Sequence, residues 1–143
     1  VQVIKRLLVD FNTGSSAVSN DAKPGADIAV KDAWNLTARD RSVIVAVIDG
    51  PVKYDHPDLE ANMWRNAAET VNGKDDDNNG VIDDIYGMNC VDNSGDINWS
   101  SAGESGHGTH VAGIVAAVNG NGVGVSGIAG GTGNGDGVRL MSC

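Results

Sequence analysis

The segment Val43-Ile44-Val45-Ala46-Val47-Ile48-Asp49 contains six consecutive apolar residues, rich in β-branched side chains, followed directly by a carboxylate. An apolar run of this length without polar alternation is typical of a strand covered on both faces, as in a parallel sheet. Asp49 then stands at the carboxyl end of the strand, the edge where open α/β sheets place their ligands. The segment therefore predicts a buried parallel strand that ends in a functional carboxylate.

A second informative segment, residues 106–118, has the period of one helix face. Its apolar residues recur at i, i+3, i+4 and i+7: Val111, Ile114, Val115 and Val118. Gly106 and Gly108 loosen the backbone just before this periodic part, so we expect His107 at or near a helix N-terminus. The positive end of the helix dipole disfavours a charged imidazole there, which favours a neutral ring that can act as a base.

The other segments complete an alternating order of elements. We expect a short helix over residues 26–34, a short strand over 85–91 and another strand over 138–143. The buried side of the short helix is expected to hold Ile28, Val30 (or Ala29) and Trp34. Strand, helix and strand in this order favour an α/β fold with a parallel sheet.

Composition limits the classes of function. The chain has 143 residues, one domain's worth, and a formal net charge of −9. This acidity argues against a general nucleic-acid binder and an anionic membrane surface, and suits a secreted protein or one that collects cations. No window reaches the ~18 consecutive apolar residues of a membrane helix. Cys90 and Cys143 allow one disulfide without requiring it, and free thiols are favoured because Cys143 is the last residue.

Three segments resemble the subtilisin-like serine peptidases. Val45–Asp49 followed by His56-Pro57-Asp58-Leu59 resembles the family's aspartate motif. Gly106-His107-Gly108-Thr109-His110-Val111-Ala112-Gly113 matches its histidine motif at every position, and Gly124–Ala129 is similar to the stretch that follows. The resemblance runs from about Pro24 to residue 143.

The resemblance implies a parallel, doubly wound α/β sheet of the subtilisin type, of which residues 1–143 would be the N-terminal portion; residues 1–23 are poorly assigned. It also implies a hydrolase that cleaves peptide bonds in protein or peptide substrates. Asp49 would orient His107, which would act as general base and then as general acid. A secreted or cell-surface location would follow.

Two departures from the family pattern bear on activity. The family has Thr or Ser and then Gly after its aspartate, whereas this chain has Gly50-Pro51. The family's nucleophile lies in a Gly-Thr-Ser-Met-Ala type motif, which does not occur in this sequence. We therefore expect this fragment to be inactive alone, and to associate with the C-terminal remainder of the domain or with itself through an exposed sheet edge. The alternative is a catalytically inactive calcium-binding or interaction module on the same scaffold.

An acidic loop over residues 72–84 suggests a calcium site. It follows an EF-hand-like pattern in which Asp75, Asp77, Asn79, the Val81 carbonyl and Asp83 supply oxygens. Position 12 of the pattern is Tyr86 in place of the usual glutamate, and Asp84 is a substitute ligand. The alternative is a solvated acidic turn without an ion.

The resemblance implies a second calcium site, beside the loop that follows the histidine helix. Its ligands would be the Asp58 carboxylate, the Asn121 side chain and the backbone carbonyls of Asn119, Val123 and Val125. The alternative is a glycine-rich turn without an ion. No organic cofactor is expected.

Overall fold

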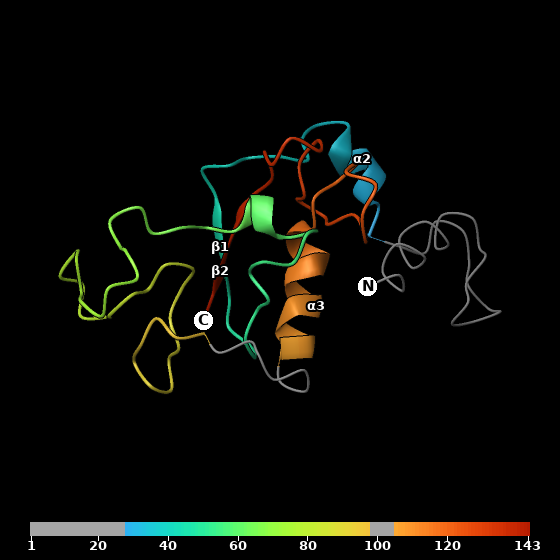
Figure 1. Cartoon of the computed structure of the whole chain (residues 1–143). Coiled ribbons are helices and arrows are strands. Elements are labelled where there is room, and N and C mark those ends of the chain that lie inside the picture. Colours follow the sequence, from blue (N-terminus) through green and yellow to red (C-terminus); the bar gives the residue numbers. More distant parts are fainter. Residues whose placement is uncertain (1–27, 98–104) are drawn as a thin grey trace.

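The computed structural model describes residues 28–97 and 105–143, so the expectations for residues 1–23 and for the start of the 26–34 helix lie outside it. The helices and strands in these ranges are α2 (Val30–Trp34), β1 (Ile44–Val47), the 3-10 helix η1 (Glu60–Asn62), α3 (Ser105–Ala116) and β2 (Arg139–Ser142). Together they form a small α/β structure (Figure 1).

β1 and β2 pair in parallel, from Ile44 opposite Arg139 to Val47 opposite Ser142. The pairing continues past the strand ends, because the Cys143 amide donates to the Val47 carbonyl (2.9 Å) and the Asp49 amide donates to the Cys143 carbonyl (3.1 Å). These bonds fix the backbone of Asp49 at the carboxyl end of β1. The predicted parallel strands, with the carboxylate at their edge, are confirmed.

The other edge of β2 carries two isolated parallel bridges, at Met63 and at Gly87, held by three hydrogen bonds. Trp64 donates to the Leu140 carbonyl, Ser142 donates to the Tyr86 carbonyl, and Met88 donates to the Ser142 carbonyl, over 2.7, 3.0 and 2.9 Å. The strand predicted over residues 85–91 is therefore wrong: it is an isolated parallel bridge at Gly87. Asn89 pairs with Ser94 in the antiparallel sense, which turns the chain back before a strand can extend.

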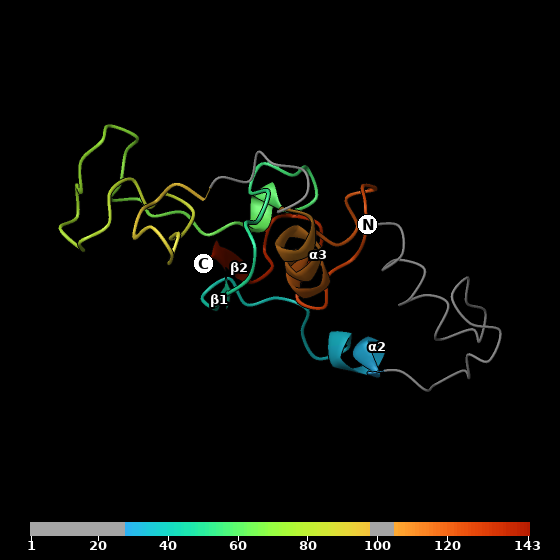
Figure 2. The same cartoon turned by 90° about the horizontal axis from the view of Figure 1, so that it is seen from below.

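α3 covers one face of the two-stranded sheet, as the two views in Figures 1 and 2 show. Exposure alternates along β1: Val47 is 4% exposed on the α3 side, whereas Ile44 is 42% exposed on the other. Ile48, just after β1, is 82% exposed. The prediction of a strand covered on both faces is therefore wrong for the part of the chain that the structure describes, where no helix packs on the second face.

The most buried residues of α3 lie beside the apolar face that the period identified. Ala112 and Ala116 are fully buried against Val47 and Leu140. The predicted face is less buried, except at Val118: Val111, Ile114 and Val115 are only partly covered. Small side chains let the helix backbone approach the sheet closely, and the larger residues flank that contact. The period identified the helix correctly, and its apolar face packs against the core beside the alanines.

α2 is shorter than the predicted helix. Ala29 adopts a left-handed conformation with φ of 52°, so the helix begins at Val30 and Ile28 lies outside its period. Val30 is buried as expected, whereas Ile28 is 64% exposed. The Trp34 ring is half-buried and its Nε1 donates to the Ile128 carbonyl (2.7 Å), which ties α2 to the loop that follows α3.

Candidate functional site

Asp49 is held at the end of β1 with its carboxylate directed toward α3. The Gly50 amide donates to its Oδ1 (2.7 Å), and the side chain is 22% exposed. The hydrogen bond from His107, together with that from the Gly50 amide, holds the pKa of Asp49 below its usual value, although burial acts in the opposite direction. The carboxylate is therefore ionised at neutral pH.

His107 lies in the first turn of α3 and faces this carboxylate. Its Nδ1 is 2.7 Å from Asp49 Oδ1 and 2.8 Å from Oδ2. An ionised carboxylate only accepts hydrogen bonds, so Nδ1 carries the proton and Nε2 of the neutral ring keeps its lone pair. The His107 side chain is 76% exposed, which leaves a base open to solvent.

The first turn of α3 packs closely on the turn that follows Asp49. A Cβ atom at Gly108 would overlap the Gly50 carbonyl oxygen, so only glycine allows this approach. Thr109 Oγ1 accepts a hydrogen bond from the Lys53 amide (2.9 Å). Pro51 has no backbone N–H, but neither hydrogen bond of this turn needs a donor at position 51. The Gly50-Pro51 departure is thus compatible with the short bond between Asp49 and His107.

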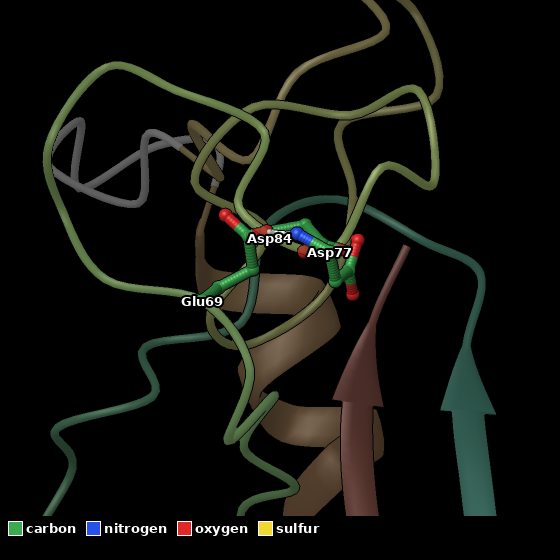
Figure 3. A group of neighbouring side chains, drawn as sticks. All are labelled: Glu69, Asp77 and Asp84. Atoms are coloured by element: carbon green, nitrogen blue, oxygen red, sulfur yellow. Dashed lines mark hydrogen bonds between the residues drawn. The ribbon is translucent and has the colours of Figure 1, made fainter.

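Three carboxylates lie close together within residues 69–84, a segment that extends away from the strands and α3 (Figures 1 and 2). Each of Glu69, Asp77 and Asp84 offers an oxygen, and these atoms lie within 4.8 Å of one another (Figure 3). Glu69 and Asp84 are only 4% and 9% exposed. Carboxylate oxygens are the ligands that calcium prefers, so this cluster could hold such an ion.

Two amide side chains bridge Asp77 and Asp84. Asn66 Nδ2 donates to both carboxylates, at 2.9 Å each, and Asn79 Nδ2 donates to both at 3.2 and 3.0 Å. Glu69 Oε1 accepts from the Asp76 and Asp77 amides at 2.8 and 2.9 Å. Backbone and amide donors thus offset part of the repulsion among the carboxylates.

The other residues of the predicted EF-hand-like pattern hold turns. Asp75 accepts from the Asn79 and Gly80 amides at 3.0 and 2.8 Å. Asp83 Oδ1 accepts from the amides of residues 72 and 73, and the Val81 amide donates to Asn79 Oδ1 (2.8 Å). Of the predicted carboxylates, the structure gathers Asp77 and Asp84 but adds Glu69, which sequence reasoning missed. Glu69 lies before residues 72–84 in the sequence, and only its burial in the structure identifies it as a possible ligand.

Two residues of the second predicted calcium site, Asn121 and Val125, lie against the Asp58 carboxylate. Asp58 is 1% exposed, and its two oxygens accept from Asn121 Nδ2 (2.8 Å) and from the Val125 amide (2.7 Å). Asn121 Oδ1 accepts from the Val123 amide (2.9 Å). The Asn119 side chain instead donates to the Gly131 carbonyl (3.0 Å). The loop after α3 therefore wraps the Asp58 carboxylate in donors.

Comparison with known proteins places these features in a family. Residues 40–133 match the subtilase family. Subtilisin-like protease 1 of Plasmodium berghei is 49% identical over 87 residues, which are 59% of this chain and 14% of that protein. Halolysin of Haloferax mediterranei is 35% identical over 119 residues, which are 80% of this chain and 19% of that protein.

Another relative, 36% identical over 117 residues, is the halolysin-like extracellular serine protease Nep of Natrialba magadii; the match covers 78% of this chain and 18% of Nep. This chain thus spans less than a fifth of the length of the curated relatives that it matches. Within residues 28–97 and 105–143, no helix is long and apolar enough to cross a membrane. The family match covers well over half of the sequence and includes both Asp49 and His107. This chain belongs to the subtilase family.

Proposed function

We propose that Asp49 and His107 are the aspartate and histidine of a catalytic triad that hydrolyses peptide bonds in protein or peptide substrates. The observation that carries the proposal is the contact of 2.7 Å between His107 Nδ1 and Asp49 Oδ1 at the carboxyl end of β1. Asp49 fixes the tautomer and stabilises the imidazolium, while Nε2 takes the proton of a serine hydroxyl and later returns it to the leaving amine. The serine is supplied from outside these 143 residues.

The uncovered face of the sheet supports the proposal that these residues form only part of a domain. Ile44 and Ile48 are exposed on the face opposite α3, and in the described part of the chain the outer edge of β1 has no neighbouring strand. Apolar residues on an unpaired edge favour association. We infer that the C-terminal remainder of a doubly wound subtilisin-like domain covers this surface, and that the isolated chain self-associates there. The name of the Natrialba magadii relative supports a secreted or cell-surface location.

The tautomer of His107 tests the catalytic proposal without any need for turnover. In the wild-type chain, ¹⁵N NMR should show a protonated Nδ1 and an unprotonated Nε2 on the neutral ring. Asp49→Asn replaces the acceptor with a group that can donate, so the preference for the Nδ1–H tautomer should disappear. Asp55→Asn is the matched control, because Asp55 contacts Lys53 and lies outside the pair. An unchanged His107 spectrum in Asp49→Asn would refute the pairing.

A fluorophosphonate probe tests the predicted inactivity of the isolated chain. Without the nucleophile a triad cannot form an acyl-enzyme, so we expect no labelled serine. Stoichiometric labelling of one serine in the 143-residue chain would contradict this part of the proposal and would identify an unexpected nucleophile.

We also propose calcium binding at Glu69, Asp77 and Asp84, the feature that favours the alternative of a calcium-binding module. The clustered carboxylates, two of them nearly buried, repel one another, and a divalent cation would offset that repulsion. Asn66 and Asn79 could contribute oxygens as well, because rotating each amide by half a turn exchanges its nitrogen for its oxygen.

Isothermal titration with calcium separates the two candidate ion sites. If calcium binds at the acidic loop, Asp77→Ala should remove the heat of binding there. Asp58→Ala should remove only the heat of calcium binding at the second site, beside the loop that follows α3. Asp92→Asn, an exposed carboxylate outside both sets, should titrate like the wild type. An absence of heat in the wild type would remove both calcium proposals and leave the catalytic pair as the function supported.

A further inference from the structure

The two cysteines lie on neighbouring segments at the edge of β2. The amide of Met88 donates to the Ser142 carbonyl (2.9 Å) and Ser142 donates to the Tyr86 carbonyl (3.0 Å), so Gly87 stands opposite Ser142. In this parallel register the next pair is Met88 and Cys143. Cys90, two residues beyond Met88, lies in the turn that follows this bridge.

Contacts of the thiols agree with this register. Cys90 Sγ donates to the Met88 carbonyl (3.8 Å), so its sulfur folds back toward the residue that faces Cys143. Burial raises the pKa of Cys143, and the nearby Cys90 thiol raises it further. The backbone of Met88 lowers the pKa of Cys143, so it also lies close to that thiol. The Cys90 sulfur thus lies beside the residue that stands next to Cys143 across the bridge.

We propose that Cys90 and Cys143 form an intramolecular disulfide that fastens the turn at residues 89–94 to the end of β2 beside Asp49. A disulfide needs Cα atoms about 5.5–6 Å apart. Cys90 and Val91 are exposed, and the turn is held mainly by its own Asn89 side chain and the Asn89–Ser94 pair. A movement of this exposed turn can bring the two Cα atoms to that distance.

The oxidant is a low-molecular-weight disulfide such as oxidised glutathione. The exposed Cys90 thiolate attacks one of its sulfurs, which breaks that disulfide and releases one glutathione thiolate. Cys143 then loses its proton and attacks the Cys90 sulfur of the mixed disulfide, which releases the second glutathione. The two protein thiols lose two protons and two electrons, and one oxidised glutathione becomes two reduced molecules.

The bond would act on the candidate active site through the backbone of Cys143. The amide and carbonyl of this residue bond to Val47 and Asp49 respectively. The disulfide therefore restrains the segment that positions the Asp49 backbone. Such a covalent bond suits the oxidising surroundings of a secreted protein. Formation of the disulfide can be measured without any peptidase activity, so its failure and the failure of the proposed function are distinguishable.

The test is oxidation of the 143-residue chain at low micromolar concentration with oxidised glutathione at pH 8, followed by alkylation and peptide mass analysis. We expect a cross-linked pair of peptides that contain Cys90 and Cys143. Cys143→Ser should stop at a stable glutathione adduct on Cys90. The attack of Cys143 on the mixed disulfide at Cys90 should be roughly tenfold or more faster in the native chain than in urea, because folding raises the effective concentration of the two thiols.

A second measurement uses stability. The oxidised wild type should melt on the order of 10 °C above the reduced wild type, since the cross-link closes a long loop in the unfolded chain. Cys90→Ser should show no such increase under the same oxidation. Mixed disulfides without the cross-link, dimers linked between chains, or equal closure rates in urea and buffer would each overturn the proposal.

Discussion

Gly108→Ala is the substitution that most directly probes how the fold positions the candidate base. The added Cβ would overlap the Gly50 carbonyl oxygen, far inside the 3.0 Å below which Cβ contacts essentially never fall. Because the obstacle is backbone, α3 has to move away from the turn by about 1 Å to bring the contact to that limit. The 2.7 Å bond between His107 and Asp49 would then lengthen to about 3.7 Å, beyond hydrogen-bond range.

The magnitude is the sum of two opposing effects. Alanine gains about 1 kcal/mol over glycine in a helix interior, whereas overpacking against backbone costs about 1–3 kcal/mol. Gly113→Ala is the matched control, because it lies in the same helix with nothing within 4 Å of its added Cβ. We expect Gly113→Ala to stabilise the chain by about 0.5–1 kcal/mol, and Gly108→Ala to be about 1–3 kcal/mol less stable than this control.

Urea unfolding measures the stability difference, and ¹⁵N NMR measures the tautomer of His107 in the same two variants. Gly108→Ala should lose the preference for Nδ1–H, while Gly113→Ala should retain it. The reasoning fails if Gly108→Ala is as stable as Gly113→Ala and keeps the wild-type tautomer, because α3 would then not rest on the Gly50 carbonyl.

Three further outcomes follow from the described contacts. Asn62→Ala should cost about 1–3 kcal/mol in urea unfolding, since buried Asn62 Nδ2 donates to the carbonyls of Ala116 and Gly130 at 3.0 and 3.2 Å; a loss below 0.5 kcal/mol would contradict this. Leu140→Ala should cost about 2–5 kcal/mol by the same assay, because Leu140 of β2 is fully buried in the core. His107→Ala should raise the pKa of Asp49 toward its usual value in ¹³C NMR of the carboxyl carbons; an unchanged pKa would show that the bond is absent in solution.

The contribution of the bond between Asp49 and His107 to stability changes with pH in a definite direction. The Asp49 carboxyl has a lower pKa in the folded chain than in the unfolded chain. The bond therefore stabilises the fold above the unfolded pKa of about 3.9, and this contribution is lost as the pH falls through the folded value. His107→Ala should lack that part of the acid dependence.

The sequence predicted the parts of the site that depend on local pattern. An uninterrupted apolar run ending in Asp49 predicted β1, and glycines before a periodic segment predicted His107 in the first turn of α3. Both predictions hold in the structure. Each needs only a strand or a helix to form around the residue in question, and both signals lie within a few positions of that residue.

The errors arose where the outcome depends on distant segments. Residues 111–118 are apolar at every position except Gly113, so period alone could not say which of them would be most buried. Close approach to the sheet selected the alanines over the valines. Glu69 was missed for a similar reason, because its role depends on burial beneath a loop that begins after it.

The same close approach connects the packing of α3 to the chemistry of the site. Ala112 and Ala116 rest on the buried face of β1 and β2, and Gly108 rests on the turn after Asp49. A larger residue at any of these positions would lift the helix, and His107 would move with it. The backbone of Asp49 is fixed independently by Cys143. The short bond between base and carboxylate thus requires two separate contacts, a paired strand end and a helix with a face of small residues, and a disturbance of either one should uncouple the pair.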